Sequence, residues 1–199
     1  MFSFTSQMPR KKQYNKEEVT QKAMKTFWDN GYKATSMRML EKDMGINLYS
    51  IYADFNSKED LFLATLKEYK TFNKTVMLSR LIKSDGTLKD VSAFLQDFVQ
   101  TVKSGKNPNG CLFANTAMEL GGSDPLVAKE LKLFFEFLKE VFTNLLTKSK
   151  AKGAIKSDAN IDKYANYLIG ITEGVALVSK VLDQDQIDDY IDTAMTAIV

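Results

Sequence analysis

Hydrophobic and polar residues follow one another along this chain with the period of helices, and few stretches show the two-residue alternation of strands. Near the N-terminus, Val19, Ala23 and Phe27 recur every four residues and form one broad apolar face. Gly, Pro and Asn residues that break helices fall mostly between such segments. The pattern predicts an all-α fold of about nine helices.

Capping signals set the expected bounds of these helices. Asn15 with Glu18 resembles a capping box, and Asp124-Pro125 places a cap before a proline at the first helical position. Asp185 is expected to open the last helix. The expected helices cover approximately residues 15–31, 36–44, 48–55, 57–81, 88–103, 111–120, 125–148, 158 or 160 to 182, and 185–198.

Two short helical segments flank the turn Gly45-Ile46-Asn47, and a longer helix follows from Ser57. A helix, a tight turn and a second short helix form the module that places a recognition helix in the DNA major groove. We therefore expect a basic arm at residues 1–14, a helix-turn-helix DNA-binding domain at 15–65, and an effector-binding and dimerisation domain at 66–199.

Charge is distributed unevenly along the chain. The formal net charge is only +2, but residues 1–70 carry 12 Lys and Arg against 9 Asp and Glu, while the remainder carries 15 against 16. Arg10 and Lys11 belong to a basic opening without acidic residues. Such an arm beside a helix-turn-helix is expected to contact phosphates or the minor groove.

The chain has one cysteine and no histidine. This composition excludes Ser-His-Asp and Cys-His catalysis, His-based metal sites and an intrachain disulfide. No apolar run reaches the length of a membrane span, and no signal peptide is evident. We expect a cytoplasmic protein that is not an enzyme, with no metal, no cofactor and no membrane association.

Two motifs surround this turn, and the spacing of their residues leaves little room for insertions or deletions. Phe27-Trp28, Gly31-Tyr32, Thr35-Ser36 and Leu40 are followed by Gly45-Ile46-Asn47, Ile51-Tyr52, Phe55, Ser57-Lys58-Glu59 and Leu61. The series is similar to the opening and core of the TetR family of transcriptional regulators, and the match covers about Val19 to Leu66.

The resemblance, with the helical geometry, indicates a DNA-binding face. Tyr52 resembles the family tyrosine that bonds a phosphate, and Lys58 opens the next helix, where its ammonium and backbone N–H groups can share a phosphate. Other candidates on this face are Arg38, Asn47, Tyr49 and Ser50. Glu41 stands where alanine is usual in the family, which predicts looser packing of the first two helices. Leu48 and Tyr49 stand where a basic residue and a glycine are common.

The resemblance also implies a homodimer built from the last two helices, which would span two operator half-sites. Gly170, Gly174 and Val178 place small residues on one stripe of the 160–182 helix. Glycine inside a helix costs about 1 kcal/mol relative to alanine, so these positions need a packing reason. Close packing within one subunit is the alternative to a dimer interface.

The second domain is rich in aromatic residues, which suggests an apolar or aromatic effector held between helices. Cys111 would begin a helix, where the dipole is expected to lower the thiol pKa and favour electrophile sensing; an inert buried cysteine is the alternative. The candidate effector contacts are Phe98, Cys111, Asn115, Met118, Glu119, Phe134, Tyr167 and Glu173.

These features favour a ligand-responsive repressor that binds a palindromic double-stranded operator as a homodimer. Effector binding would change the spacing of the two recognition helices through the connector at 60–80. An all-helical small-molecule carrier with a vestigial DNA-binding module is the alternative. A helical enzyme is disfavoured, since histidine and nucleotide motifs are absent.

Overall fold

The computed structural model describes residues 14–198, so the predicted arm residues Arg10 and Lys11 lie outside the described part. Within it, the chain forms ten α-helices and one π-helical segment, with no strand. The elements are α1 (Lys16–Asn30), α2 (Met37–Met44), α3 (Leu48–Phe55), α4 (Lys58–Phe72), η1 (Asn73–Met77), α5 (Ser79–Lys83), α6 (Leu88–Lys103), α7 (Leu112–Leu120), α8 (Pro125–Ala151), α9 (Ile161–Val178) and α10 (Gln184–Thr196). The expected all-α fold is confirmed.

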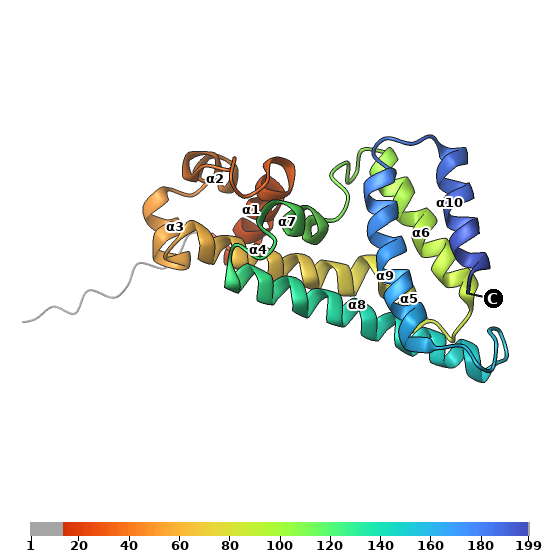
Figure 1. Ribbon diagram of the computed structural model, residues 1–199. Coiled ribbons are helices and arrows are strands. Elements are labelled where there is room, and N and C mark those ends of the chain that lie inside the picture. Colours follow the sequence, from red (N-terminus) through yellow and green to blue (C-terminus); the bar gives the residue numbers. More distant parts are fainter. Residues whose placement is uncertain (1–13, 199) are drawn as a thin grey trace, which may run out of the picture.

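Two bodies lie at opposite ends of the molecule (Figure 1). The smaller body consists of α1, α2, α3 and the start of α4, and its core contains Phe27, Leu40, Ile51 and Phe62. In the larger body α6, α9 and α10 pack together. Helices α4 and α8 run side by side between the two bodies, and α7 lies beside α1 (Figure 1). Effects in the larger body therefore have two helical routes to the smaller one.

The connector departs from the single helix expected over 57–81. It is divided into α4, the π-helical η1 and the short α5, which accounts for the higher helix number. In η1 the N–H of Leu78 reaches back five residues to the carbonyl of Asn73, at 2.8 Å. The Asn73 side chain is buried and donates to the carbonyl of Tyr69 at 3.0 Å. Such π turns occur frequently at functional sites.

The caps mostly follow the sequence signals, with two differences. The Asn15 side chain accepts from the N–H of Glu17, and its capping box with Glu18 does not form. The capping box lies instead at α10, where Asp183 and Gln186 exchange hydrogen bonds. The last helix therefore begins with Asp183 as its cap rather than at Asp185. Among the described residues, none of the helices combines the length and apolar character needed to cross a membrane.

Candidate nucleic-acid interface and internal cavity

The turn between α2 and α3 is fixed by one backbone conformation and two hydrogen bonds. Gly45 adopts the left-handed conformation at φ 71°, which costs glycine little. The Asn47 side chain accepts from the N–H of Ser50 at 2.9 Å, so it caps α3. Glu41 accepts from the N–H of Leu48, also at 2.9 Å. The Glu41 carboxylate therefore satisfies an N–H at the start of α3, and the looser packing expected between the first two helices stays a prediction.

Helix α3 presents a polar and aromatic face to solvent. Ile51 and Phe55 are buried and anchor the helix. Tyr49 and Tyr52 face outward and are 84% and 47% exposed. Asn47 is also exposed, Ser50 is half-buried, and Arg38 projects from the neighbouring α2. The structure thus brings these predicted DNA-binding residues onto two adjacent helices.

Lys58 has a more constrained position than the sequence suggested. Its ammonium lies 4.4 Å from the centre of the Tyr32 ring, a cation–π distance. Partial burial lowers the pKa of Lys58, and Glu119 acts in the opposite direction. Lys58 is the first residue of α4, and its side chain reaches Tyr32 in the loop between α1 and α2.

Glu119, predicted to orient an effector, lies at this same junction. Its carboxylate accepts from the backbone N–H groups of Tyr32 and Lys33, at 2.8 and 2.7 Å. The Lys33 ammonium donates in return to the Glu119 carbonyl at 3.2 Å. A Cβ at Gly31 would lie 2.9 Å from the carboxylate, so glycine permits the close approach. Glu119 joins α7 to the loop that precedes α2 and does not line the internal cavity.

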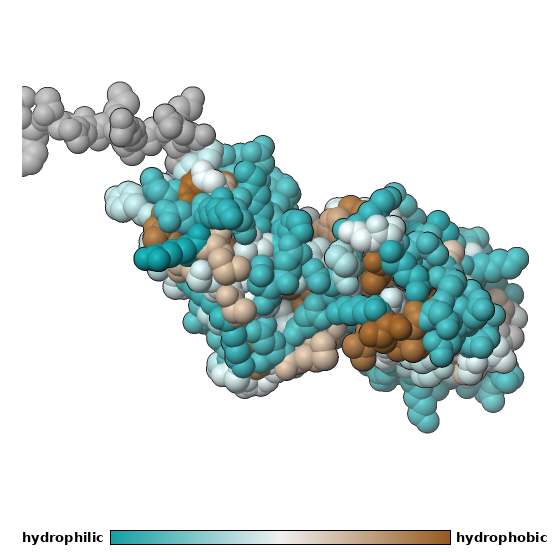
Figure 2. Space-filling model, turned by 90° about the horizontal axis from the view of Figure 1, so that it is seen from above, coloured by the Kyte–Doolittle hydropathy of each residue, from teal (hydrophilic) through white to brown (hydrophobic). Residues whose placement is uncertain are grey.

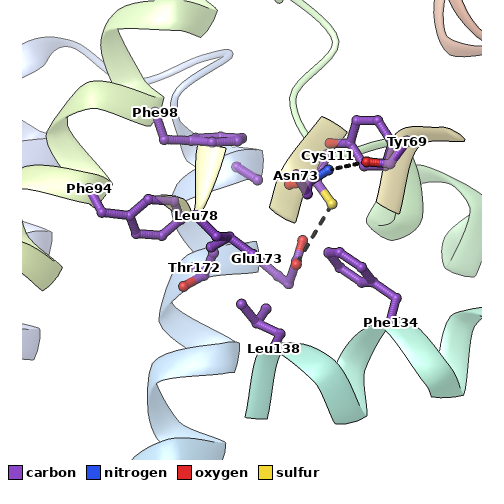
Figure 3. Close-up of a pocket in the computed structure, with 11 residues that line it drawn as sticks. Tyr69, Asn73, Leu78, Phe94, Phe98, Cys111, Phe134, Leu138, Thr172 and Glu173 are labelled. Atoms are coloured by element: carbon purple, nitrogen blue, oxygen red, sulfur yellow. Dashed lines mark hydrogen bonds between the residues drawn. The ribbon is translucent and has the colours of Figure 1, made fainter. Parts of the chain in front are cut away.

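An internal cavity lies between α4, α6, α8 and α9 (Figure 3). Its free volume is about 20 Å³, room for about one water molecule. Four predicted effector contacts line it together: Phe98, Cys111, Phe134 and Glu173. Tyr69, Asn73 and Phe94 also line it. No signal in the sequence predicted the π turn that brings in Asn73.

A second hollow opens on the other side of Cys111 and Glu173. This outer groove has a free volume of about 260 Å³ and a mainly apolar lining that includes Phe135 and Leu177. The predicted contacts Asn115 and Met118 lie here rather than in the internal cavity. Tyr167 lines neither space and is 36% exposed on α9. Figure 2 shows apolar patches interrupting the hydrophilic surface of the larger body.

The wall between the two spaces carries a buried acid and a thiol. The Cys111 thiol donates to one carboxylate oxygen of Glu173 across 3.7 Å (Figure 3). Burial raises the pKa of Glu173 to about 7. Burial, then the charge of Glu173, raises the pKa of Cys111 well above its usual value. The expected lowering of the Cys111 pKa is wrong, because the N–H of Ala114 that reaches the sulfur does not offset burial.

The three small residues of α9 occupy different environments. A Cβ at Gly170 would meet nothing within 4 Å, whereas one at Gly174 would lie 2.5 Å from the Tyr190 hydroxyl of α10. Val178 is partly buried against the core. Gly174 therefore has a packing reason within the subunit, and Gly170 lies on an open face.

Both segments of the chain match known families. Residues 19–65 match the family model for "Bacterial regulatory proteins, tetR family", and residues 87–198 match "Tetracyclin repressor-like, C-terminal domain". The chain is 26% identical over 194 residues to the HTH-type transcriptional regulator YezE of Bacillus subtilis (strain 168), covering 96% of this chain and 100% of YezE. It is 27% identical over 175 residues to the HTH-type transcriptional repressor ComR of Escherichia coli (strain K12), covering 86% of this chain and 82% of ComR.

Solved structures share the fold. A cysteine mutant of the TetR family transcriptional regulator CifR, complexed with 26-base-pair double-strand operator DNA, superposes with a TM-score of 0.83 at 24% identity, covering 96% of this chain and 100% of that one. The regulatory protein TetR of Rhodobacter sphaeroides superposes with a TM-score of 0.82 at 19% identity, covering 92% and 98%. At these identities the likeness shows the arrangement of helices.

Proposed function

Because the chain belongs to the TetR family of transcriptional regulators, we propose that it is a repressor that binds a palindromic operator as a homodimer and leaves it when an effector binds. The family is one of regulators and not of enzymes. ComR is a repressor, and the cysteine mutant of CifR is complexed with double-strand operator DNA. The observation that carries the proposal is the exposed face of α3, on which Tyr49 is 84% exposed on a firmly capped helix.

A homodimer is supported by the open side of α9. Tyr167 and Gly170 lie on α9, and Val181 follows three residues after the helix ends at Val178. Tyr167 and Val181 are 36% and 79% exposed, and the value for Val181 is unusually high for a branched apolar side chain. A second copy packed on this side would cover them and set two α3 helices at a fixed separation.

The route from effector to DNA follows α7. Its N-terminal cap, Cys111, lines the internal cavity, and Glu119 near its other end bonds the loop before α2. Phe113 of α7 stacks on Phe134, with ring centres 4.0 Å apart. A ligand that separates Cys111 from Glu173 would therefore shift α7 and the loop that it bonds. This route adds to the expected one through the connector at 60–80.

An apolar or aromatic effector suits the lining of the two spaces better than an electrophile does, and its bulk would lie in the outer groove, because the internal cavity has room for about one water molecule. Phe94, Phe98 and Phe134 contribute aromatic rings to the internal cavity. The raised pKa of Cys111 keeps the thiol protonated at neutral pH, and the thiolate is the form that attacks electrophiles.

Binding to the DNA upstream of the chain's own gene tests the proposal. We expect specific retention of an inverted repeat that weakens steeply with salt, measured by fluorescence anisotropy. Tyr52→Phe removes one phosphate hydrogen bond per subunit and should weaken binding about tenfold. Tyr164→Phe, on α9 of the larger body, is the matched control and should leave the affinity unchanged. Absence of specific retention at every salt concentration would favour the small-molecule carrier instead.

A further inference from the structure

Glu173 carries a buried polar atom that the fold does not satisfy. One carboxylate oxygen, Oε1, accepts from the Cys111 thiol, while Oε2 is buried and has no hydrogen-bond partner among the described residues. Glu173 also belongs to no ion pair within residues 14–198. An unpaired buried carboxylate is costly and rare in folded proteins, so its retention calls for a partner.

The other polar groups of the internal cavity are already occupied. The Asn73 amide donates to the carbonyl of Tyr69, and the Thr172 hydroxyl donates to that of Leu168 at 2.8 Å. Neither is available to Glu173. Among the residues lining the cavity, Glu173 Oε2 is the buried side-chain oxygen that has no hydrogen-bond partner within the described part of the chain.

Aromatic rings surround this acceptor. Phe94 and Phe98 of α6, Phe134 of α8 and Tyr69 of α4 line the space beside it (Figure 3). The negative faces of aromatic rings attract cations, and they do so more strongly where water is excluded. A carboxylate among aromatic rings is a pairing suited to an organic cation.

We infer that the effector is an organic amine whose ammonium group binds Glu173 Oε2 and whose apolar body lies in the outer groove; this rests on the proposed function. The internal cavity holds only about 20 Å³, enough for the ammonium group. The outer groove offers about 260 Å³ and shares Cys111, Glu173 and Ala176 with it as a common wall. Met118, Leu177 and Phe135 give that groove its apolar surface.

Protonation of Glu173 gives the inference a pH signature. Its pKa of about 7 leaves the empty site roughly half protonated at neutral pH. An ammonium pairs with the carboxylate only, so affinity should rise between pH 6 and pH 8 and binding should release a proton. The other titratable groups that face Glu173 are Cys111 and Tyr69, whose pKa values are raised well above their usual range by burial, so they stay protonated over this interval. Lys180 lines the outer groove and donates to Asn115 at 3.3 Å.

Benzylamine and 2-phenylethylamine, each compared with its alcohol, test the inference on the full chain. Trp28 is the single tryptophan and lies 4.8 Å from the Tyr69 ring, so its fluorescence reports binding, with calorimetry as the second measurement. We expect at least one amine to bind about tenfold or more tightly than its alcohol. Glu173→Gln should remove that preference and the pH dependence, while Glu136→Gln, at an exposed site on α8, should keep both.

Three outcomes would overturn the inference: equal affinity for amine and alcohol, an amine preference that survives in Glu173→Gln, or no binding of either amine to the native chain. The comparison of amine and alcohol on the native chain remains decisive even if Glu173→Gln fails to fold. Operator retention is measured in parallel. A chain that holds its operator but ignores the amines refutes the ligand class alone, whereas failure to bind the operator in the absence of any amine refutes the proposed function.

Discussion

The two bodies of this molecule satisfy their polar groups in different ways. In the smaller body the side-chain acceptors lie close in sequence to the backbone N–H groups that they bind. Asn47 accepts from the N–H of Ser50, Ser36 from that of Met39, and Glu41 from that of Leu48. In the larger body Glu173 is half-buried, and its buried oxygen Oε2 has no hydrogen-bond partner among the described residues, beside a π turn in the connector. Apart from Trp28 Nε1, a buried donor with no partner among the described residues, the smaller body satisfies these groups locally, which suits a fixed surface. The larger body leaves one buried carboxylate oxygen without a partner, and a ligand can supply that partner.

Glu119 joins the two bodies and belongs to neither pattern. It is separated by 87 and 86 residues from Tyr32 and Lys33, whose N–H groups it accepts. Its bonds give the larger body a direct contact with the loop before α2. Contacts through α7 therefore connect the smaller body to the larger one. Each of the following substitutions tests the smaller body, the larger body or this connection.

The largest effect is expected from Phe113→Ala in α7. Phe113 is fully buried, stacks on Phe134 and lies 5.6 Å from the Tyr69 ring. Loss of such a ring costs about 3–5 kcal/mol of unfolding free energy, because the surroundings cannot close the cavity. Urea unfolding followed by Trp28 fluorescence measures it. Leu133→Ala on α8, at a position 38% exposed, should cost far less; equal losses would show that the stack is not a special support.

Glu119→Gln tests the connection between the bodies. Glutamine keeps one acceptor but turns an NH₂ group toward a backbone N–H, so one of two hydrogen bonds is lost. We expect about 1–3 kcal/mol lower unfolding stability and a weaker response of operator affinity to effector. Glu136→Gln, which loses only an exposed ion pair with Lys132, should change both by little. A full effector response in Glu119→Gln would mean that the signal bypasses this contact.

A smaller effect is expected within the smaller body, where two substitutions at Glu41 separate charge from hydrogen bonding. Glu41→Gln keeps an acceptor for the N–H of Leu48 and should leave unfolding stability close to native. Glu41→Ala removes it and should cost about 0.5–2 kcal/mol, the usual range for a lost helix cap. Thermal unfolding and operator anisotropy give the two readouts. Similar stability for both variants would show that the bond to Leu48 contributes little.

Prediction from sequence succeeded where the physical cause is local. Gly45 predicted the end of α2, and Asn47 and Ser57 predicted the starts of α3 and α4; the structure confirms all three. The apolar period gave the buried faces of α1 and α8. The same reasoning grouped Phe98, Cys111, Phe134 and Glu173, which do line one cavity. It could not show that Glu119 and Tyr167 lie away from this cavity, because a polar residue on an amphipathic helix has the same sequence signature whether it faces a cavity, a neighbouring loop or solvent.

The sequence by itself determined the all-α fold, the helix-turn-helix and the family, since these depend on residue spacing and on caps within a few positions of one another. Only the tertiary structure decided the environments of Glu119, Glu173 and Cys111. Burial and distant partners set a carboxyl pKa to about 7, keep a thiol protonated and place a carboxylate on a loop 86 residues away. Those contacts depend on how α7 and α9 pack against helices remote in sequence, which a period of 3.6 residues does not encode.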